Sequence, residues 1–170
     1  MTNFKRAAVA LGLTMSLLCI NAGCAQQADA KIGTAGNEPL TYGAPISLDE
    51  ATRLVERGIA LAKALGRPMA FAIVEPSGDL VAFVRMDGVV YASTQVAIQK
   101  ARSAARFRLD TAEFETRVMA GRTVLLASEE VLPIGGGVPI LADGCVIGAI
   151  GVSGGTSAED ASMARTIIGE

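Results

Sequence analysis

The feature that most constrains the fold is a pair of apolar runs near the carboxyl end of the chain, bracketed by glycine clusters. The runs at 138–141 and 145–152 are rich in β-forming residues, and Ala142-Asp143-Gly144 between them supplies residue types that tolerate a positive φ. This pattern predicts a β-hairpin. Gly148 and Gly151 leave little side chain on its second strand, so a helix, another subunit's backbone or a flat ligand can approach the sheet closely.

A run of three glycines, Gly135, Gly136 and Gly137, precedes this hairpin. Successive backbone N–H groups in such a run could form a concave anion-binding array, for which a carboxylate or a propionate would be the ligand. A flexible connection that enters a strand explains the run equally well. Neither this run nor 151–155 matches a P-loop or a dinucleotide-binding fingerprint, so a nucleotide phosphate site is not expected.

Capping residues, glycines and prolines divide the rest of the chain into further elements. Ser47-x-x-Glu50 and Thr156-x-x-Glu159 are typical of helix starts, and Ser93 and Asp110 are candidate caps for two more helices. The predicted order is a helix from 47 to 65, strands at 69–74 and 80–85, helices at 93–107 and 110–120, strands at 138–141 and 145–152, and a helix from 156 to 168. Four antiparallel strands from two hairpins, covered by helices, predict an α+β sandwich.

The amino-terminal 30 residues are typical of a secretory signal peptide. Lys5 and Arg6 precede an apolar run at 7–20, which is too short for a comfortable membrane span, and Ala28-x-Ala30 suggests cleavage after Ala30. The expected location is therefore periplasmic or secreted. The residues before Cys24 faintly resemble a bacterial lipobox, so membrane attachment is expected only if Cys24 is lipidated.

The remaining chain is expected to form one domain. Residues 31–45 are rich in glycine and proline and read as a linker or an ordered amino-terminal arm, and 46–170 as the folded domain. With 51% hydrophobic residues and 19% charged residues, the chain can bury a compact core. A net charge of −2 argues against a nucleic-acid partner.

Several short motifs between 46 and 168 occur in the predicted strands, turns and helices. They are Pro76-x-Gly78-x-Leu80, Phe83-x-Arg85-Met86-Asp87-Gly88, Ser93, Ala97, Lys100-Ala101, Gly136-Gly137-Val138-Pro139-Ile140 and Gly148-x-x-Gly151-Val152-Ser153-Gly154-Gly155. Together they resemble the GlcG/HbpS-like family of haem-binding or haem-degrading proteins, whose domain also occurs at the end of some corrinoid adenosyltransferases. The resemblance implies a profilin-like α–β–α fold, assembly into dimers or larger rings, and binding of haem or its iron in some extracellular members.

The helix expected at 93–107 offers candidate ligand-binding residues for a tetrapyrrole. Lys100, Arg102 and Arg106 give it a basic flank beside small alanines, and Arg102 and Arg106 lie one turn apart, so they could grip a carboxylate pair. The alternative is a solvated basic face. Lys100 also stands in the family pattern, which favours it as the site residue.

Iron coordination is restricted because the chain has no histidine. Tyr91 could bind ferric iron as a phenolate, or could simply line the start of a helix. Cys145 could bind a soft metal or haem, or could pack as a small apolar residue. The methionines are scattered and are expected to fill the core.

Enzyme chemistry of the Ser-His-Asp, Cys-His or zinc type is improbable without histidine. An acid–base reaction on a small carbonyl or carboxylic acid stays open, in which Arg85 or Lys100 holds the acid and Asp87 or Glu75 moves a proton. The alternative is an ion pair between Arg85 and Asp87 that fixes the end of the first hairpin. Ser153 could face a ligand or cap the last helix.

Three functions are consistent with these patterns. The first is an exported haem- or tetrapyrrole-binding protein that sequesters or degrades haem, which needs a flat apolar slot near Lys100 and the glycine-rich hairpin. The second is a small-molecule enzyme or an accessory factor of an oxidative catabolic pathway, which needs a polar pocket with a perturbed titratable group. The third is a structural or sensory homo-oligomer whose glycine faces serve subunit packing.

Overall fold

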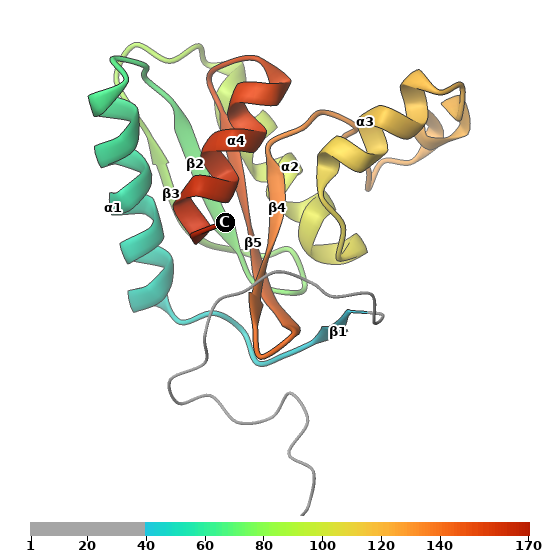
Figure 1. Ribbon diagram of the computed structural model, residues 1–170, viewed down its shortest axis with the longest axis horizontal. Helices are drawn as coiled ribbons and strands as arrows, with labels where there is room; N and C mark the ends of the chain where they lie inside the picture. The colour runs from blue at the N-terminus through green and yellow to red at the C-terminus, as the bar shows by residue number, and fades with distance from the viewer. Residues whose placement is uncertain (1–39) are drawn as a thin grey trace, which may run out of the picture.

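The computed structural model describes residues 40–170 (Figure 1). The elements are β1 (Thr41–Tyr42), α1 (Leu48–Ala64), β2 (Ala70–Val74), β3 (Leu80–Arg85), α2 (Ala92–Phe107), α3 (Thr111–Met119), the 3-10 helix η1 (Thr123–Ala127), β4 (Gly137–Ala142), β5 (Cys145–Ser153) and α4 (Ser157–Ile168). The predicted signal peptide, Cys24 and most of the predicted arm lie outside the described residues. Within 40–170, no helix is long and apolar enough to cross a membrane.

A five-stranded sheet forms the centre of the α+β fold. β5 pairs antiparallel with both β2 and β4, and β2 pairs antiparallel with β3, as two hairpins predict. The fifth strand was not expected: β1 comes from the segment read as a linker or arm, and it pairs parallel with the start of β5, Thr41 opposite Cys145. The sheet is therefore mixed, with one short parallel edge.

Tyr42 explains why this short strand is held. Its hydroxyl donates to the carbonyl oxygens of Ala105 at 3.2 Å and of Arg106 at 2.6 Å, at the carboxyl end of α2. The last carbonyls of a helix have no partner within the helix, so they accept such a donor readily. The Arg108 guanidinium also lies 5.0 Å from the centre of the Tyr42 ring.

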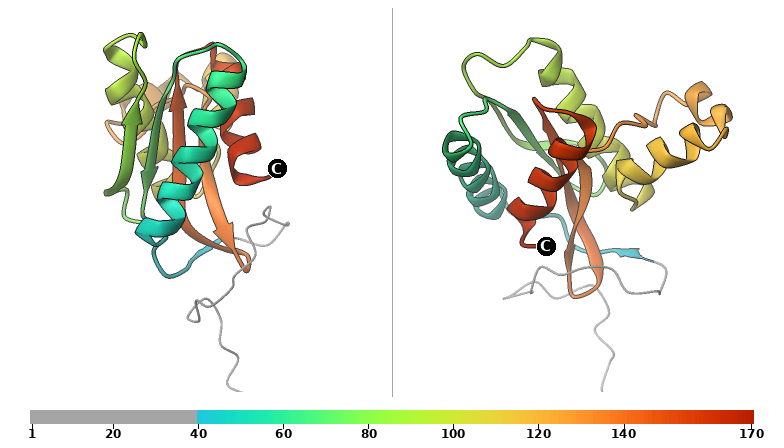
Figure 2. Two further views of the ribbon diagram at one scale, coloured as in Figure 1. Left: turned by 90° about the vertical axis from the view of Figure 1, so that its left-hand side faces the viewer. Right: turned by 45° about the horizontal axis from the view of Figure 1, so that its top comes forward.

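Helices cover both faces of the sheet, which confirms the three-layer arrangement (Figure 2). α1 and α4 pack on one face over large apolar side chains such as Phe71, Ile73 and Ile150. α2 packs on the other face, where the contact is made largely by alanines of α2, β2 and β5. Small side chains on both surfaces bring α2 close to the strands.

Gly151 shows why a glycine is needed on β5. A methyl group there would overlap the carbonyl oxygen of Ala97 in α2, and one on Gly148 would overlap the carbonyl oxygen of Val74 in β2. The sequence left a helix, another subunit's backbone or a flat ligand as the neighbour of the glycines on this strand, and at Gly151 the neighbour is a helix, α2. In the β4–β5 turn, Asp143 and Gly144 have φ values of 49° and 76°, as the hairpin prediction requires.

Two predicted caps are wrong. Ser93 does not cap α2, because Tyr91 already has helical dihedrals and the helix begins at Ala92. Ser153 does not cap α4, because it is the buried last residue of β5. The α4 cap is Thr156, whose side chain forms a complete capping box with Glu159, as expected.

Candidate functional site

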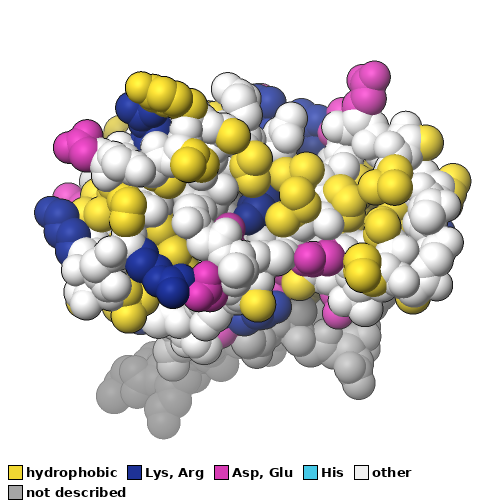
Figure 3. Space-filling model, turned by 90° about the horizontal axis from the view of Figure 1, so that it is seen from above, with side chains coloured by type: hydrophobic (Ala, Val, Ile, Leu, Met, Phe, Trp, Pro, Cys, Tyr) yellow, Lys and Arg dark blue, Asp and Glu magenta, His cyan; other side chains and the backbone are white. Residues whose placement is uncertain are grey.

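A groove of about 650 Å³ runs between the carboxyl end of α1 and one side of α4. Its lining is mostly apolar: Leu61, Ala64, Leu65, Met69, Ala158 and Met163, with the polar residues Arg67, Glu159, Ser162 and Thr166. Figure 3 looks onto the end of the molecule where α1 ends and α4 begins, and hydrophobic side chains are scattered over it among a few charged ones. An apolar groove with few polar groups is the usual form of a small-molecule site.

The rim of this groove carries an ion pair. The Arg67 guanidinium contacts Oε1 of Glu159, while Oε2 of Glu159 accepts from the backbone N–H and the hydroxyl of Thr156, both at 3.0 Å. The Thr156 backbone N–H, with help from Arg67, lowers the pKa of Glu159 from 4.5 to about 2. Glu159 is therefore ionised under ordinary conditions and is held in place by its own capping box.

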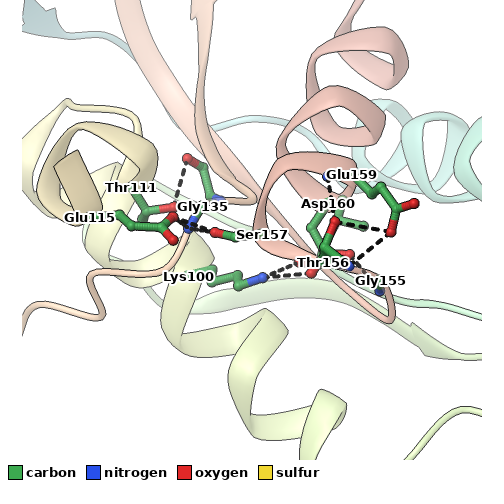
Figure 4. A network of polar contacts seen from close by, with 11 residues as sticks. Lys100, Thr111, Glu115, Gly135, Gly155, Thr156, Ser157, Glu159 and Asp160 are labelled. Carbon is green, nitrogen blue, oxygen red and sulfur yellow. Dashed lines mark hydrogen bonds and ion pairs between the residues drawn. The ribbon is translucent and has the colours of Figure 1, made fainter. Parts of the chain in front are cut away.

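Lys100 lies inside the protein, with only 1% of its surface exposed. Its ammonium donates to Oδ2 of Asp160 at 2.7 Å and to the carbonyl oxygen of Val152 at 3.0 Å (Figure 4). Oδ1 of Asp160 accepts from the backbone N–H of Gly155 at 2.8 Å. The side chain runs from α2 on one face of the sheet to α4 on the other. The role of Lys100 in ligand binding stays a prediction. In this structure its ammonium binds Asp160 and Val152 in the protein interior.

Gly136 is close to this pair. It is buried with a φ of 119°, and a methyl group there would meet the Lys100 ammonium and the Asp160 side chain. Only a glycine leaves room for the Lys100 side chain beside the start of β4.

The glycine run binds groups of its own chain. The backbone N–H of Gly135 donates to the Glu115 carboxylate at 2.9 Å and to the Ser157 hydroxyl at 2.7 Å, and that hydroxyl also contacts Glu115. The N–H of Gly137 donates to the Thr111 hydroxyl at 2.9 Å. The acceptors at the glycine run are thus the Glu115 carboxylate and the hydroxyl groups of Ser157 and Thr111. Ligand binding by Gly136 and Gly137 stays a prediction.

Arg102 and Arg106 hold the β2–β3 turn. Nε of Arg102 donates to the Gly78 carbonyl oxygen at 3.0 Å, and Nε of Arg106 donates to that of Ser77 at 2.6 Å. Arg106 also forms an ion pair with Glu130. The pair is side by side as predicted, and both guanidinium groups have backbone partners, so binding of a ligand carboxylate pair stays a prediction.

Arg85 and Tyr91 lie together at the opposite end of the sheet. The Arg85 guanidinium sits 5.0 Å from the centre of the Tyr91 ring, and Tyr91 is 85% exposed. The expected Arg85–Asp87 ion pair is not among the ion pairs of the described residues, because Arg85 packs against the tyrosine ring instead. Glu75 follows β2 at the β2–β3 turn, so the structure does not bring it to Arg85 and Asp87.

The two candidate metal ligands are also far apart. Cys145 begins β5 and is buried, with its sulfur 3.4 Å from the Thr41 hydroxyl, whereas Tyr91 precedes α2 near the other end of β5. Residues 40–170 contain no cluster of three or more histidine, cysteine, aspartate or glutamate side chains that could hold a metal ion. Ser153 is buried at the end of β5.

The groove and its rim have no clear pattern in the sequence. Arg67 follows the helix-terminating Gly66, and Glu159 was recognised only as a capping residue. The signal for Asp160 was equally weak, because its partner Lys100 is 60 positions away. An acidic residue directly after a capping glutamate is unremarkable on a helix amino terminus.

The family model for HbpS-like proteins, described as "haem degrading protein HbpS-like", matches residues 46–168. The chain belongs to this family. Protein GlcG of Escherichia coli is 34% identical over 108 residues, 64% of this chain and 81% of GlcG. A 15.0 kDa protein of Citrobacter freundii, from the dhaT–dhaS intergenic region, is 32% identical over 74% of this chain and 91% of its own length. The corrinoid adenosyltransferase PduO of the same organism is 28% identical, and the match spans 38% of its length.

Solved structures agree with the fold. A crystal structure of HbpS has a TM-score of 0.68 at 28% identity, covering 79% of this chain and 95% of that one. The structure described as a PduOC:heme complex has a TM-score of 0.67 at 27% identity, covering 74% of this chain and 94% of the other. The profilin-like family fold expected from the sequence motifs is therefore confirmed.

Proposed function

We propose that this protein is an exported haem- or tetrapyrrole-binding protein and that the groove between α1 and α4 is its binding site. The observation that carries the proposal is a largely apolar groove in a fold shared with a haem complex. The family description supports the same ligand class. Export is proposed from the signal-peptide pattern of residues 1–30.

The residues of the groove fit a flat apolar ligand. Its volume of about 650 Å³ lies within the range of about 300–1,000 Å³ common for ligand pockets. Leu61, Leu65 and Met69 offer apolar walls for a macrocycle, and Arg67 offers a cation for a carboxylate. Haem, when bound, supplies the redox and ligand-exchange chemistry of its iron.

No imidazole is available to bind the iron, since the chain has no histidine. The lining groups with donor atoms are the Glu159 carboxylate, the thioethers of Met69 and Met163, and the hydroxyl groups of Ser162 and Thr166. Thioethers coordinate haem iron in some proteins, whereas neutral hydroxyl groups are weak ligands. Sequestration requires only binding. Degradation would appear as loss of the Soret band and release of iron when a reductant and oxygen are supplied.

Haemin titration of the purified protein tests the site. Ala64, an exposed groove residue at the end of α1, is replaced by tryptophan to fill the groove, and exposed Ala60 of the same helix, which does not line the groove, is replaced by tryptophan as the matched control. We expect saturable binding at one haemin per chain, weakened at least tenfold by Ala64→Trp and unchanged by Ala60→Trp. Non-saturating association of the unaltered protein would refute the function, and equal effects of the two variants would refute the groove.

The enzyme hypothesis has less support from the geometry. Its expected acid-binding and proton-transfer residues include Arg85 and Asp87 at one end of the β2–β3 hairpin and Glu75 at the other. Glu75 therefore lies apart from Arg85 and Asp87. The geometry therefore favours haem binding over the enzyme hypothesis.

A further inference from the structure

The groove contains one basic side chain among its described lining residues, Arg67. It directly follows Gly66, whose φ of 64° ends the α1 segment and turns the chain toward β2. The Arg67 side chain is half exposed and reaches across the groove rim to Glu159 on α4. A guanidinium at this place is available both to the solvent and to a molecule that lies in the groove.

The Arg67 guanidinium has more donors than its partner uses. It carries five N–H bonds in a planar fork, and its ion pair is a contact of Nη1 with Oε1 of Glu159. The remaining donors are of the kind that binds a second carboxylate, and a planar fork suits a carboxylate in two-point contact.

Glu159 acts as a positioning residue for this guanidinium. Its Oε2 is held by the Thr156 backbone and hydroxyl in the capping box, so the other oxygen, Oε1, which contacts Arg67, has a defined place at the rim. Thr156 and Arg67 together keep the pKa of Glu159 at about 2, so the carboxylate stays charged wherever the protein is folded at ordinary pH. Arg67 is therefore oriented before a ligand arrives, which lowers the entropy cost of binding.

We infer that Arg67 is the carboxylate-binding residue of the groove and makes it selective for tetrapyrroles that carry a free propionate. This inference rests on the proposed function. The macrocycle lies against Leu61, Leu65 and Met163, one propionate contacts the Arg67 guanidinium, and Glu159 keeps its contact with the same guanidinium. The other propionate has no cation among the described lining residues and faces solvent.

The test compares haemin with its dimethyl ester, which keeps the macrocycle and the iron but has no ionised carboxylate. Arg67→Gln is expected to weaken haemin binding about three- to tenfold, because a half-exposed charge-assisted contact contributes less than a buried one. The ester is expected to bind the unaltered protein and Arg67→Gln with affinities equal within about twofold. Exposed Arg53 of α1, which does not line the groove, provides the matched control Arg53→Gln.

The outcomes separate the inference from the function. If the unaltered protein binds neither haemin nor the ester, the proposed function fails. If it binds both, and Arg67→Gln weakens both equally or neither, the function stands and the role of Arg67 is refuted. Thermal melting of each variant checks that the fold is retained. Raising the ionic strength should reduce the preference for haemin over the ester in the unaltered protein and should have little effect on Arg67→Gln.

Discussion

Lys100 places a positive charge inside the protein. Its ammonium and the Asp160 carboxylate are almost fully enclosed, and each has one further hydrogen bond to the backbone. Such a pair contributes little net stability when compared with well-packed apolar residues, because both charges lose their water. Removing one partner is different, since it leaves the other charge buried and unpaired.

Lys100→Ala is therefore expected to lower the free energy of unfolding by about 3–5 kcal/mol, with the Asp160 carboxylate left without its cation. The double variant Lys100→Met with Asp160→Leu removes both charges and should recover most of this loss. Urea unfolding followed by circular dichroism measures both effects. Lys63→Ala, at an exposed lysine in the last turn of α1, is the control and should change stability by less than about 0.5 kcal/mol.

If Lys100→Ala unfolded at the same urea concentration as the unaltered protein, the pair would carry no such penalty. Haemin binding by Lys100→Ala should be measured together with its stability. Asp160 lies on α4, which also lines the groove, so a destabilised α4 would weaken binding indirectly. The sequence singled out Lys100, but as a ligand residue, because neither its burial nor its distant partner leaves a local pattern.

At the scale of elements, α4 joins the groove rim to the core. Its first turn contains the capping box of Thr156 and Glu159, followed directly by Asp160. Glu159 contacts the Arg67 guanidinium at the rim, and the next residue, Asp160, binds the Lys100 ammonium in the interior. The geometry of the rim therefore depends on how well this helix start is held.

Acidification should loosen this helix start. The pKa of Glu159 is about 2 in the folded protein and about 4.5 ordinarily, so its contribution to stability is complete above about pH 4.5 and is lost as the pH falls toward 2. We expect the urea midpoint to fall over this range, and to fall less steeply in Glu159→Gln, which retains an oxygen for the cap. Glu56→Gln on exposed α1 is the control. Glu170 works in the opposite direction, since burial raises its pKa.

A pH dependence that is identical in Glu159→Gln and in the unaltered protein would assign the acid sensitivity to other carboxyl groups. Solution measurements at constant ionic strength are needed, because surface ion pairs are screened by salt.

The elements that the sequence predicted well have strong local signals. Ser47, Asp110 and Thr156 each accept a backbone N–H at the start of their helices, and the apolar runs around Asp143 and Gly144 form the expected hairpin. The two-residue strand β1 has no such signal, because its place depends on Tyr42 bonding to a distant helix end. The groove rim lacks a local signal for the same reason, because Arg67 in the segment after α1 and Glu159 in α4 are far apart in the chain.

At the scale of the whole molecule, α3 and η1 form an arm beside the three-layer body (Figure 1). No residue of η1 is buried, and the exposed side chains of the arm include Met119, Val124 and Leu126. Figure 3 shows hydrophobic side chains gathered over this side. A gathering of exposed apolar side chains is typical of surfaces that contact another protein.

The predicted homo-oligomer should therefore use this arm. We expect light scattering after gel filtration to give a mass at least twice that of one chain, and Leu126→Glu to shift the protein toward the single chain, because a charge would have to be buried at the contact. Leu48→Glu, at an equally exposed leucine on α1, is the control. A single-chain mass for the unaltered protein at micromolar concentration would contradict the prediction.

The contact between Lys100 and Asp160 also has a consequence for how the molecule opens. α2 and α4 lie on opposite sides of the sheet. If α4 moved away from the sheet, the Lys100 ammonium of α2 would lose its counter-ion, Asp160. Neither layer can loosen alone without that cost, so their backbone amides should exchange with solvent deuterium in a single cooperative event. The pair thus makes two helical layers behave as one unit in hydrogen exchange.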